Sequence, residues 1–311
     1  MEKRPILIDC DPGIDDIAAL LLARQIAHFD VKAITVVAGN VGLEYTAKNA
    51  LSLLSFMGWD IPLGKGAEKP LARPLETAED VHGKTGMRGL ALPETDRRPV
   101  DQPAWDLIYQ VAKENRGRLE IVAVGPLTNI AIALAKYPEL TGWIKRIVIM
   151  GGAFLAGNTT PAAEFNIYVD PEAAKRVFTS GIPFYLCPLD VTHQGYLTEE
   201  ELLEIGAMGS KEAGLFCDIL RRGLEVCRVY TGGKGLPLHD PLALLFAADE
   251  SYYTVQECFV GVETQGSITR GKTVTDCQSD KKLDKNGFCV QTVNRDAFLR
   301  HIRSLLSGYG G

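Results

Sequence analysis

Short aliphatic runs alternate with segments of helical spacing through the first two thirds of the chain. The aliphatic runs are residues 6–9, 31–39, 118–125, 144–152 and 182–190, and the segments of helical spacing are 14–27, 43–58, 127–138, 170–181 and 198–208. The aliphatic runs are nearly continuous in Ile, Val and Leu, which is typical of strands covered on both faces. This alternation predicts an α/β fold: an open, mostly parallel, Rossmann-like sheet flanked by helices.

The last third of the chain has a less regular pattern. We expect helices from about Ser210 to Thr231 and from about Asp240 to Asp249, strands at 253–264, 270–275 and 287–293, and a final helix that begins near Asn294. The terminal "SGYGG" is predicted to be a frayed tail. Residues 64–104 are rich in Gly and Pro and have no period, and so long a loop is usually functional or disordered. No repeat or linker divides the chain, so we expect one domain over residues 1–311.

Composition narrows the function. The net charge is −6 at pH 7, which argues against nucleic acid or an anionic membrane as the main partner, because both require a basic face. No stretch approaches the roughly 20 apolar residues of a membrane helix, and the N-terminal apolar run is too short for a signal peptide. The seven cysteines include no C-x-x-C pair, so we interpret them as buried thiols of a cytoplasmic protein rather than as disulfides or a zinc site.

Unusual polar residues follow the predicted strands. Asp9 and Asp11 close the first strand and Asn40 closes the second, while "VGPLTN" (124–129) and "GGAFLAGNTTPAAEFNIYVD" (151–170) follow the third and fourth. Ligands of open α/β sheets bind beyond the carboxyl ends of the strands. The sequence therefore predicts one composite site along that edge of the sheet.

The stretch "PILIDCDPGIDD" places four aspartates within eight positions, directly after an apolar run. Asp15 and Asp16 fall in the first turn of a helix, where acidic residues are ordinary. That explanation does not cover Asp9 and Asp11, since unpaired carboxylates beside a core are costly. Oxygen-only ligands favour a hard cation, and Ca²⁺ is preferred over Mg²⁺ if backbone carbonyls also contribute.

Several motifs together resemble the nucleoside hydrolases. They are "DCDPGIDD", "VVAGN", "HGKTG", "VGPLTN", "MGGAF", "AEFNIYVDPEAA" and "LHDPLA", in this order over nearly the whole chain. The strongest similarity is to bacterial ribonucleoside hydrolases that favour pyrimidine nucleosides. The resemblance implies a tightly held Ca²⁺, a small ribonucleoside as substrate and hydrolysis of its N-glycosidic bond to ribose and free base. It also implies a homo-oligomer, a dimer or a tetramer.

The resemblance assigns roles to individual residues. Its metal ligands correspond to Asp11, Asp16, the carbonyl of Val124, and Asp240. Its ribose-binding groups correspond to Asp15, Asn40, Asn158, Glu164 and Asn166, and the histidines that face the nucleobase correspond to His82 and His239.

An oxocarbenium-like transition state needs activated water, anions near the sugar and a donor for the leaving base. Asp11 suits the first task, and His239 the last, with His82 assisting or holding the base. We leave His28, His193 and His301 as structural or surface residues. The end of the helix at 210–231, from Cys227 to Thr231, is expected to border the base pocket.

Other interpretations remain open. Asp240 could be the N-cap of a helix with Pro241 at its first position, alone or together with metal ligation. "GSITRGKT" (266–273) matches a phosphate-binding loop, but a strand-like segment follows it, so a hairpin connection is favoured. "DCD" could be the nucleophile–acid pair of a Mg²⁺-dependent phosphatase. A catalytically silent nucleoside- or ribose-binding module is the third alternative.

Overall fold

A computed structural model describes residues 3–227, 235–277 and 283–310. Within these ranges, a central sheet has the strand order β10-β9-β11-β6-β5-β4-β1-β2-β3. Its strands are β1 (Arg4–Cys10), β2 (Phe29–Val36), β3 (Leu63–Lys65), β4 (Leu119–Ala123), β5 (Ile144–Met150), β6 (Phe184–Cys187), β9 (Tyr253–Val262), β10 (Thr273–Asp276) and β11 (Gly287–Val293). All neighbours from β11 to β3 are parallel, and only β9 and β10 run antiparallel to their partners. The predicted open, mostly parallel sheet is confirmed.

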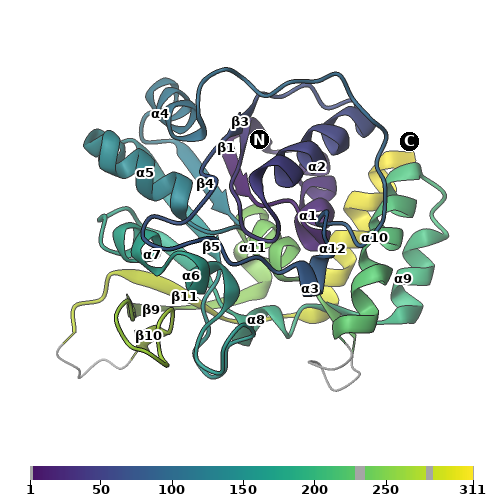
Figure 1. The fold of residues 1–311 in the computed structure, drawn as a ribbon. Coiled ribbons are helices and arrows are strands. Elements are labelled where there is room, and N and C mark those ends of the chain that lie inside the picture. Colours follow the sequence, from purple (N-terminus) through teal and green to yellow (C-terminus); the bar gives the residue numbers. More distant parts are fainter. Residues whose placement is uncertain (1–2, 228–234, 278–282, 311) are drawn as a thin grey trace.

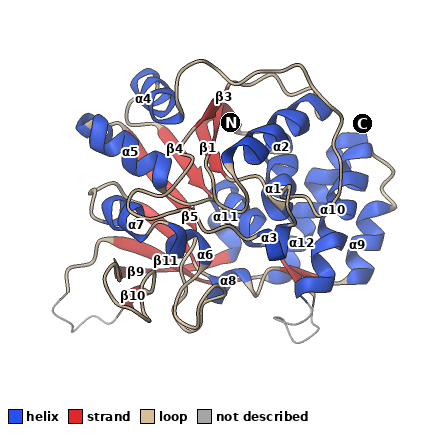
Figure 2. Ribbon diagram, viewed as in Figure 1, coloured by secondary structure: helices blue, strands red, loops and turns tan. Residues whose placement is uncertain are grey.

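Helices cover both faces of the sheet (Figures 1 and 2). They are α1 (Ile14–Gln25), α2 (Leu43–Phe56), α3 (Glu79–His82), α4 (Ala104–Glu114), α5 (Thr128–Lys136), α6 (Phe165–Val169), α7 (Pro171–Phe178), α8 (Leu189–Thr192), α9 (Glu199–Gly206), α10 (Lys211–Cys227), α11 (His239–Ala248) and α12 (Arg295–Ser307). Ile6 and Ile8 of β1 pack into the core beneath α1, α10 and α12, whereas Leu7 packs into the core beneath α4, α5 and α7. This alternation explains why the strand sequences are apolar at every position.

The segment 64–104 is more ordered than its sequence indicates. It contains the end of β3, which pairs with β2 at the edge of the sheet, and the four-residue helix α3. Helix α4 begins at its last residue and was not predicted. A two-stranded ribbon of β7 (Tyr196–Leu197) and β8 (Leu236–Pro237) was not predicted either. These elements are short, and tertiary contacts rather than local periodicity define them.

The prediction of a frayed C-terminal tail is wrong for Ser307–Gly310. Residues Gly308–Gly310 form a 3₁₀ turn, and the Tyr309 hydroxyl donates a hydrogen bond of 2.7 Å to the carbonyl of Leu21. An aromatic side chain with a polar tip can pack on the core and still satisfy its hydroxyl, and this attaches the chain end to α1.

The interpretation of all cysteines as free thiols is also wrong. Cys258 of β9 and Cys277, directly after β10, form a disulfide with a Cα–Cα distance of 4.3 Å. The register pairs Asp276 with Phe259, so the two cysteines face each other across the hairpin. The remaining free cysteines of the described chain are buried, as predicted: Cys10, Cys187, Cys217 and Cys289.

The string "GSITRGKT" lies in the connection between β9 and β10. The two strands are antiparallel, and β10 begins at the threonine of the string, directly after the lysine. A phosphate-binding loop requires a helix at that point. The predicted hairpin connection is confirmed, and the interpretation as a nucleotide-binding loop is excluded.

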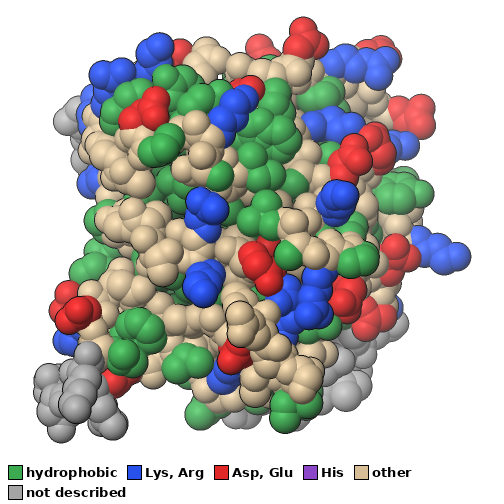
Figure 3. Space-filling model, turned by 60° about the vertical axis from the view of Figure 1, so that its left-hand side comes forward, with side chains coloured by type: hydrophobic (Ala, Val, Ile, Leu, Met, Phe, Trp, Pro, Cys, Tyr) green, Lys and Arg blue, Asp and Glu red, His purple; other side chains and the backbone are tan. Residues whose placement is uncertain are grey.

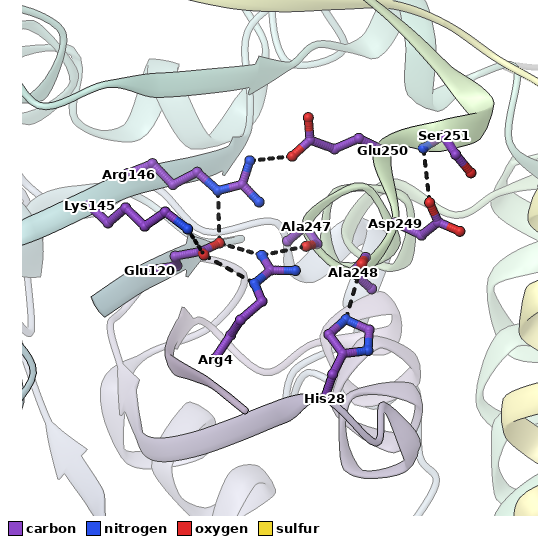
Figure 4. Close-up of polar contacts among 10 residues, drawn as sticks. All are labelled: Arg4, His28, Glu120, Lys145, Arg146, Ala247, Ala248, Asp249, Glu250 and Ser251. Atoms are coloured by element: carbon purple, nitrogen blue, oxygen red, sulfur yellow. Dashed lines mark hydrogen bonds and ion pairs between the residues drawn. The ribbon is translucent and has the colours of Figure 1, made fainter. Parts of the chain in front are cut away.

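A buried carboxylate joins the amino ends of three strands (Figure 4). Glu120 of β4 accepts hydrogen bonds from Arg4 of β1 (3.1 Å to Nε), Lys145 of β5 (2.9 Å) and Arg146 of β5 (2.7 Å). Burial acts to raise the pKa of Glu120, but the Arg4 hydrogen bond and the charge of Arg146 outweigh it and lower the pKa to about 2. This network lies at the opposite end of the sheet from the carboxyl ends of the strands.

On the face in Figure 3, Lys and Arg side chains are interspersed with Asp, Glu and hydrophobic side chains. This mixture is not the single-sign basic face that binds a polyanion. Within the described ranges, no helix combines the length and the apolar character that crossing a membrane requires.

Candidate active site

The loop after β1 carries the acidic cluster, and backbone groups orient its carboxylates. Asp16 accepts hydrogen bonds from the N–H groups of Asp11 (3.0 Å) and Gly13 (2.9 Å), and from the side-chain amide of Asn40 (3.1 Å). Asp11 accepts a 2.7 Å bond at Oδ2 from the N–H of Asn40. Because Asn40 follows β2, these bonds join the carboxyl ends of two neighbouring strands, as the sequence predicts.

Two glycines leave room for the Asp11 carboxylate. A Cβ on Gly39 would lie 2.2 Å from Asp11 Oδ2, and a Cβ on Gly125 would lie 2.6 Å from Asp11 Oδ1. Both distances are far below van der Waals contact. The glycines of "VVAGN" and "VGPLTN" are therefore required by the close approach of the Asp11 carboxylate to the backbone.

Asp9 and Asp11 differ in their surroundings, although both are fully buried. Asp9 accepts hydrogen bonds from the Thr35 hydroxyl and from Asn129 Nδ2 (2.8 Å). Burial raises the pKa of Asp9 to about 7, although both hydrogen bonds lower it. One oxygen of each carboxylate, Asp9 Oδ2 and Asp11 Oδ1, is buried and has no hydrogen-bond partner among the described residues. A buried carboxylate oxygen without a donor is suited to accept a cation.

Three further carboxylates converge beside Asp11. Oxygen atoms of Asp15, Asp16 and Asp240 lie within 4.8 Å of one another. Burial raises the pKa of Asp240 well above its usual value, and the nearby charges of Asp15 and Asp16 raise it further. Such a cluster is stable in its ionised form only with a compensating positive charge. The donor set consists of oxygen atoms, so it fits a hard divalent cation.

Asp240 is not the N-cap of its helix. Helix α11 begins at His239, its N-cap is Leu238, and no side chain caps it. Asp240 therefore lies within the first turn, and the capping interpretation is wrong. Its carboxylate is free to take part in the cluster, where the helix N-terminus favours a negative charge.

Glu164 and Asn166 order the opposite side of the site. Glu164 caps α6, with Oε1 accepting from the N–H of Asn166 (2.9 Å) and Oε2 from Gly152 (2.9 Å) and Ile167 (3.1 Å). Asn166 Nδ2 donates a 2.9 Å bond to the carbonyl of Val124. A carbonyl oxygen has a second lone pair, so Val124 can still accept a further ligand.

These groups line one cavity of about 800 Å³. The predicted site residues that line it are Asp15, Asn40, His82, Val124, Asn158, Glu164, Asn166, His239 and Asp240. The other two, Asp11 and Asp16, are fully buried and do not line it. The volume lies in the range of small-molecule sites. The structure thus brings the predicted residues together.

His82 is buried and is bonded to the first residue of α1. It ends helix α3, is 9 % exposed, and accepts a 3.1 Å hydrogen bond at Nδ1 from the N–H of Ile14. Burial lowers the pKa of His82, while the charge of Asp15 opposes the shift. The neutral ring must then carry its proton on Nε2, so His82 is a hydrogen-bond donor.

His239 has a different partner. Its Nδ1 lies 2.7 Å from the hydroxyl of Thr192, and its ring lies edge-on to His193 with centroids 5.6 Å apart. Burial lowers the pKa of His239 to about 4, against the charge of Asp15. The imidazole is therefore neutral at pH 7 before any ligand binds.

Some cavity residues were not predicted. Asp190 and His193 line the cavity from the segment after β6, and Leu155 and Phe165 line it beside Asn158. The signal for Asp190 and His193 was present, since "PLDVTH" follows a predicted strand as the other site segments do. The predicted contribution of Cys227–Thr231 to the base pocket falls on residues 228–231, which lie outside the described residues, and on Cys227, whose side chain is not described.

Comparisons with known proteins agree with this geometry. The sequence model described as "Inosine-uridine preferring nucleoside hydrolase" matches residues 6–300. A pyrimidine-specific ribonucleoside hydrolase RihA of Photobacterium profundum is 42 % identical over 99 % of this chain and 100 % of its own. A plant nucleoside hydrolase has a TM-score of 0.93 at 34 % identity, covering 98 % of this chain and 99 % of its own. A purine-preferring ribonucleoside hydrolase from Gardnerella vaginalis has a TM-score of 0.92 at 31 % identity, with the same two coverages. The chain belongs to the family of inosine-uridine preferring nucleoside hydrolases.

Proposed function

We propose that this chain hydrolyses the N-glycosidic bond of ribonucleosides, with pyrimidine nucleosides preferred and with possible activity on inosine. The observation that carries the proposal is the acidic cluster at the cavity: oxygens of Asp15, Asp16 and Asp240 lie within 4.8 Å of one another. Asp15 and Asp240 line the same cavity as His82, His239, Asn40 and Asn166. The pyrimidine preference is supported by the relative that is 42 % identical and named pyrimidine-specific. The purine-preferring neighbour is only 31 % identical.

We propose Ca²⁺ as the metal, held by Asp11, Asp16, Asp240 and the carbonyl of Val124. Carboxylates mixed with a backbone carbonyl are typical calcium ligands. When bound, a divalent ion supplies positive charge that orients the ribose diol and acidifies a water molecule. Asp15 lies within reach of the same cluster.

Asp11 is proposed as the general base. Its Oδ2 accepts the N–H of Asn40, whereas Oδ1 has no partner among the described residues, so its two lone pairs can serve both the proposed cation and a proton from water. A positioned base of this kind contributes roughly 10²–10⁴-fold to a rate.

On the sugar side, Asp15, Asn40, Asn158, Glu164 and Asn166 are proposed to hold the ribose hydroxyls. The carboxylates among them also favour the positive charge that develops on the ribosyl ring. Glu164 is well suited to this task because three backbone N–H groups fix its orientation.

On the base side, His239 is proposed to assist the leaving base, and His82 to hold it through Nε2–H. The two rings have separate anchors, Thr192 and the N–H of Ile14 respectively. His239 is adjacent in sequence to Asp240, which places leaving-group assistance next to the cluster.

The phosphatase alternative is disfavoured by the position of Asp9. That residue would have to attack phosphorus, yet it lies within β1 rather than in the turn beyond it, and its Oδ1 already accepts hydrogen bonds from Thr35 and Asn129. A silent binding module is disfavoured by the base-side histidines, since ribose binding alone does not need them.

The experiment is a reducing-sugar assay with uridine, cytidine, inosine and adenosine, each with and without a strong calcium chelator. We expect ribose release from uridine and cytidine, slower release from inosine, and loss of activity with the chelator. Binding of nucleosides without release of any base would support the silent module instead.

We further propose a single domain over residues 1–311, a homo-oligomeric assembly and a cytoplasmic location. The assembly rests on the family resemblance, and light scattering after gel filtration tests it. The location is supported by four buried free cysteines, while the Cys258–Cys277 disulfide is more typical of an oxidising compartment. Fractionation of cells that express the native gene decides between the two.

A further inference from the structure

The segment Ala153–Leu155 has neither helical nor strand structure, yet its backbone is fully hydrogen-bonded. It follows β5 and leads into the loop that carries Asn158. Ala153 is buried, and buried backbone groups outside regular structure need partners from side chains or water. Here the partners are side chains of two distant segments.

The N–H groups of this segment donate to the side chains of Asp190 and Thr273. Asp190, which follows β6, accepts from the N–H of Phe154 at 2.7 Å and from the N–H of Leu155 at 3.2 Å. Thr273 Oγ1 lies 2.9 Å from the N–H of Ala153. Each of the three donors therefore has a side-chain acceptor.

One cation contacts all three carbonyl groups, and the Thr273 hydroxyl also donates to the carbonyl of Ala153 at 2.8 Å. Lys272 Nζ donates to the carbonyls of Ala153 (3.0 Å), Phe154 (2.9 Å) and Leu155 (3.2 Å). An ammonium group has three donors, so these bonds use all of them. Charge-assisted hydrogen bonds are about twice as strong as neutral ones. Lys272 therefore binds the carbonyl groups of the segment, and Asp190 binds the N–H groups of Phe154 and Leu155.

The turn that carries Lys272 is itself fixed. Arg270 donates to both oxygens of Glu172 in α7, at 2.7 and 2.6 Å. A Cβ on Gly271, which has a φ of +80°, would lie 2.8 Å from the Cα of Tyr168 in α6. The turn therefore rests directly on α6 and α7, and the lysine is presented from a rigid base.

We propose that Lys272 and Asp190 are positioning residues, which hold the loop 153–159 in the shape that presents Asn158 to the ribose. The proposal rests on the proposed nucleoside hydrolysis. Residues 155–159 line the cavity. Asn158 Oδ1 accepts a 2.9 Å hydrogen bond from the N–H of Phe165, which attaches this part of the loop to the start of α6. The lysine of the "GKT" string acts on backbone carbonyls of its own chain, not on a phosphate.

The test compares Lys272→Met with Lys145→Met, which removes an ammonium group that bonds Glu120 far from the cavity. We expect Lys272→Met to raise KM for uridine about tenfold, with kcat within threefold of wild type. Inhibition by D-ribose should weaken by the same factor, because the proposed partner of Asn158 is the sugar and not the base. Lys272→Arg should restore part of the loss, and Lys145→Met should leave KM and the ribose constant unchanged.

If Lys272→Met does not fold, Thr273→Val serves as a milder variant. We expect it to raise KM for uridine and to weaken ribose inhibition by a smaller factor. Hydrogen exchange of the peptide 151–163 supplies a readout that needs no turnover, and we expect it to rise in Lys272→Met only. Unchanged KM and ribose inhibition in an active, folded Lys272→Met protein overturn the positioning role and leave the proposed hydrolysis intact. A wild-type protein that cleaves no nucleoside overturns both, even if exchange rises.

Discussion

The imidazole of His82 accepts a hydrogen bond at Nδ1 from the backbone N–H of Ile14, with a distance of 3.1 Å between the two nitrogens. This bond joins a residue of the long 64–104 segment to the first residue of α1, directly before Asp15 and Asp16. It fixes the tautomer of the ring and the position of α3 over the cavity. A shift of His82 is therefore coupled to a shift of the segment that carries the proposed metal ligands.

Gly13→Ala tests whether the contact of His82 with the start of α1 matters for turnover. A Cβ at Gly13 would lie 2.4 Å from His82 Nδ1 and 2.7 Å from Asn40 Nδ2, so one or both side chains must move. Overpacking of this kind costs about 1–3 kcal/mol, and we expect kcat/KM for uridine to fall roughly 5- to 150-fold. Gly42→Ala is the control, because nothing lies within 4 Å of its Cβ. Equal activity of both variants would show that the contact between Gly13 and His82 is dispensable.

Asp11→Ala should abolish hydrolysis of uridine or inosine. The variant removes the unpartnered Oδ1 and with it the proposed base, and we expect kcat to fall by about 10³-fold or more. Steady-state rates with both nucleosides measure the effect. A turnover number equal to that of wild type would remove Asp11 from the mechanism.

His239→Ala should slow turnover and leave ribose affinity largely intact. The ring is anchored by Thr192 on the base side, so its loss should lower kcat by about 10²-fold or more while inhibition by D-ribose is unchanged. An equal loss of ribose affinity would mean that His239 is structural.

Glu120 makes stability depend on acid pH. Its pKa is about 2 in the folded protein and near 4.5 when unperturbed, so folding favours the ionised form. The stabilisation is complete above pH 4.5 and is lost as the pH falls towards 2. The difference corresponds to about 3 kcal/mol. Glu120→Gln should lower the free energy of unfolding by about that amount at pH 7 and flatten its decline between pH 4.5 and 2.

Glu257→Gln is the matched control for that measurement. Its side chain is 55 % exposed and pairs with Lys285 at 3.6 Å, and exposed ion pairs contribute at most about 1 kcal/mol. Urea unfolding at a series of pH values measures both variants. Parallel curves for Glu120→Gln and wild type would show that the network does not couple folding to protonation.

The parts of the fold with strong periodicity could be predicted from the sequence. The apolar run of β1 and the following "DPGIDD" identify a strand, a turn and a helix, and the acidic cluster follows from their order. Helix α3 could not be predicted, since its four residues are placed by the contact of His82 with Ile14. The disulfide likewise depends on the register of β9 with β10, which places Cys258 and Cys277 opposite each other only after the hairpin has formed.

The residues of the site likewise divide into those that sequence motifs identify and those that only tertiary contacts identify. Asp11, Asn40 and Asp240 are identifiable from motifs, because a strand end or a helix start fixes each of them. The role of Lys272 is not, since a lysine in a glycine-rich turn gives no sign that its partners lie about 120 residues earlier. Asp240 shows the limit of local rules: its position before a proline predicts an N-cap, but the N-cap of α11 is Leu238, two residues earlier.

Calcium titration into chelator-treated protein tests the central claim most directly, with uridine turnover measured in the same samples. The acidic cluster around Asp11 predicts one tightly bound Ca²⁺ per chain, and turnover that rises in proportion to occupancy. Full turnover by protein in which elemental analysis detects no divalent metal would contradict the account.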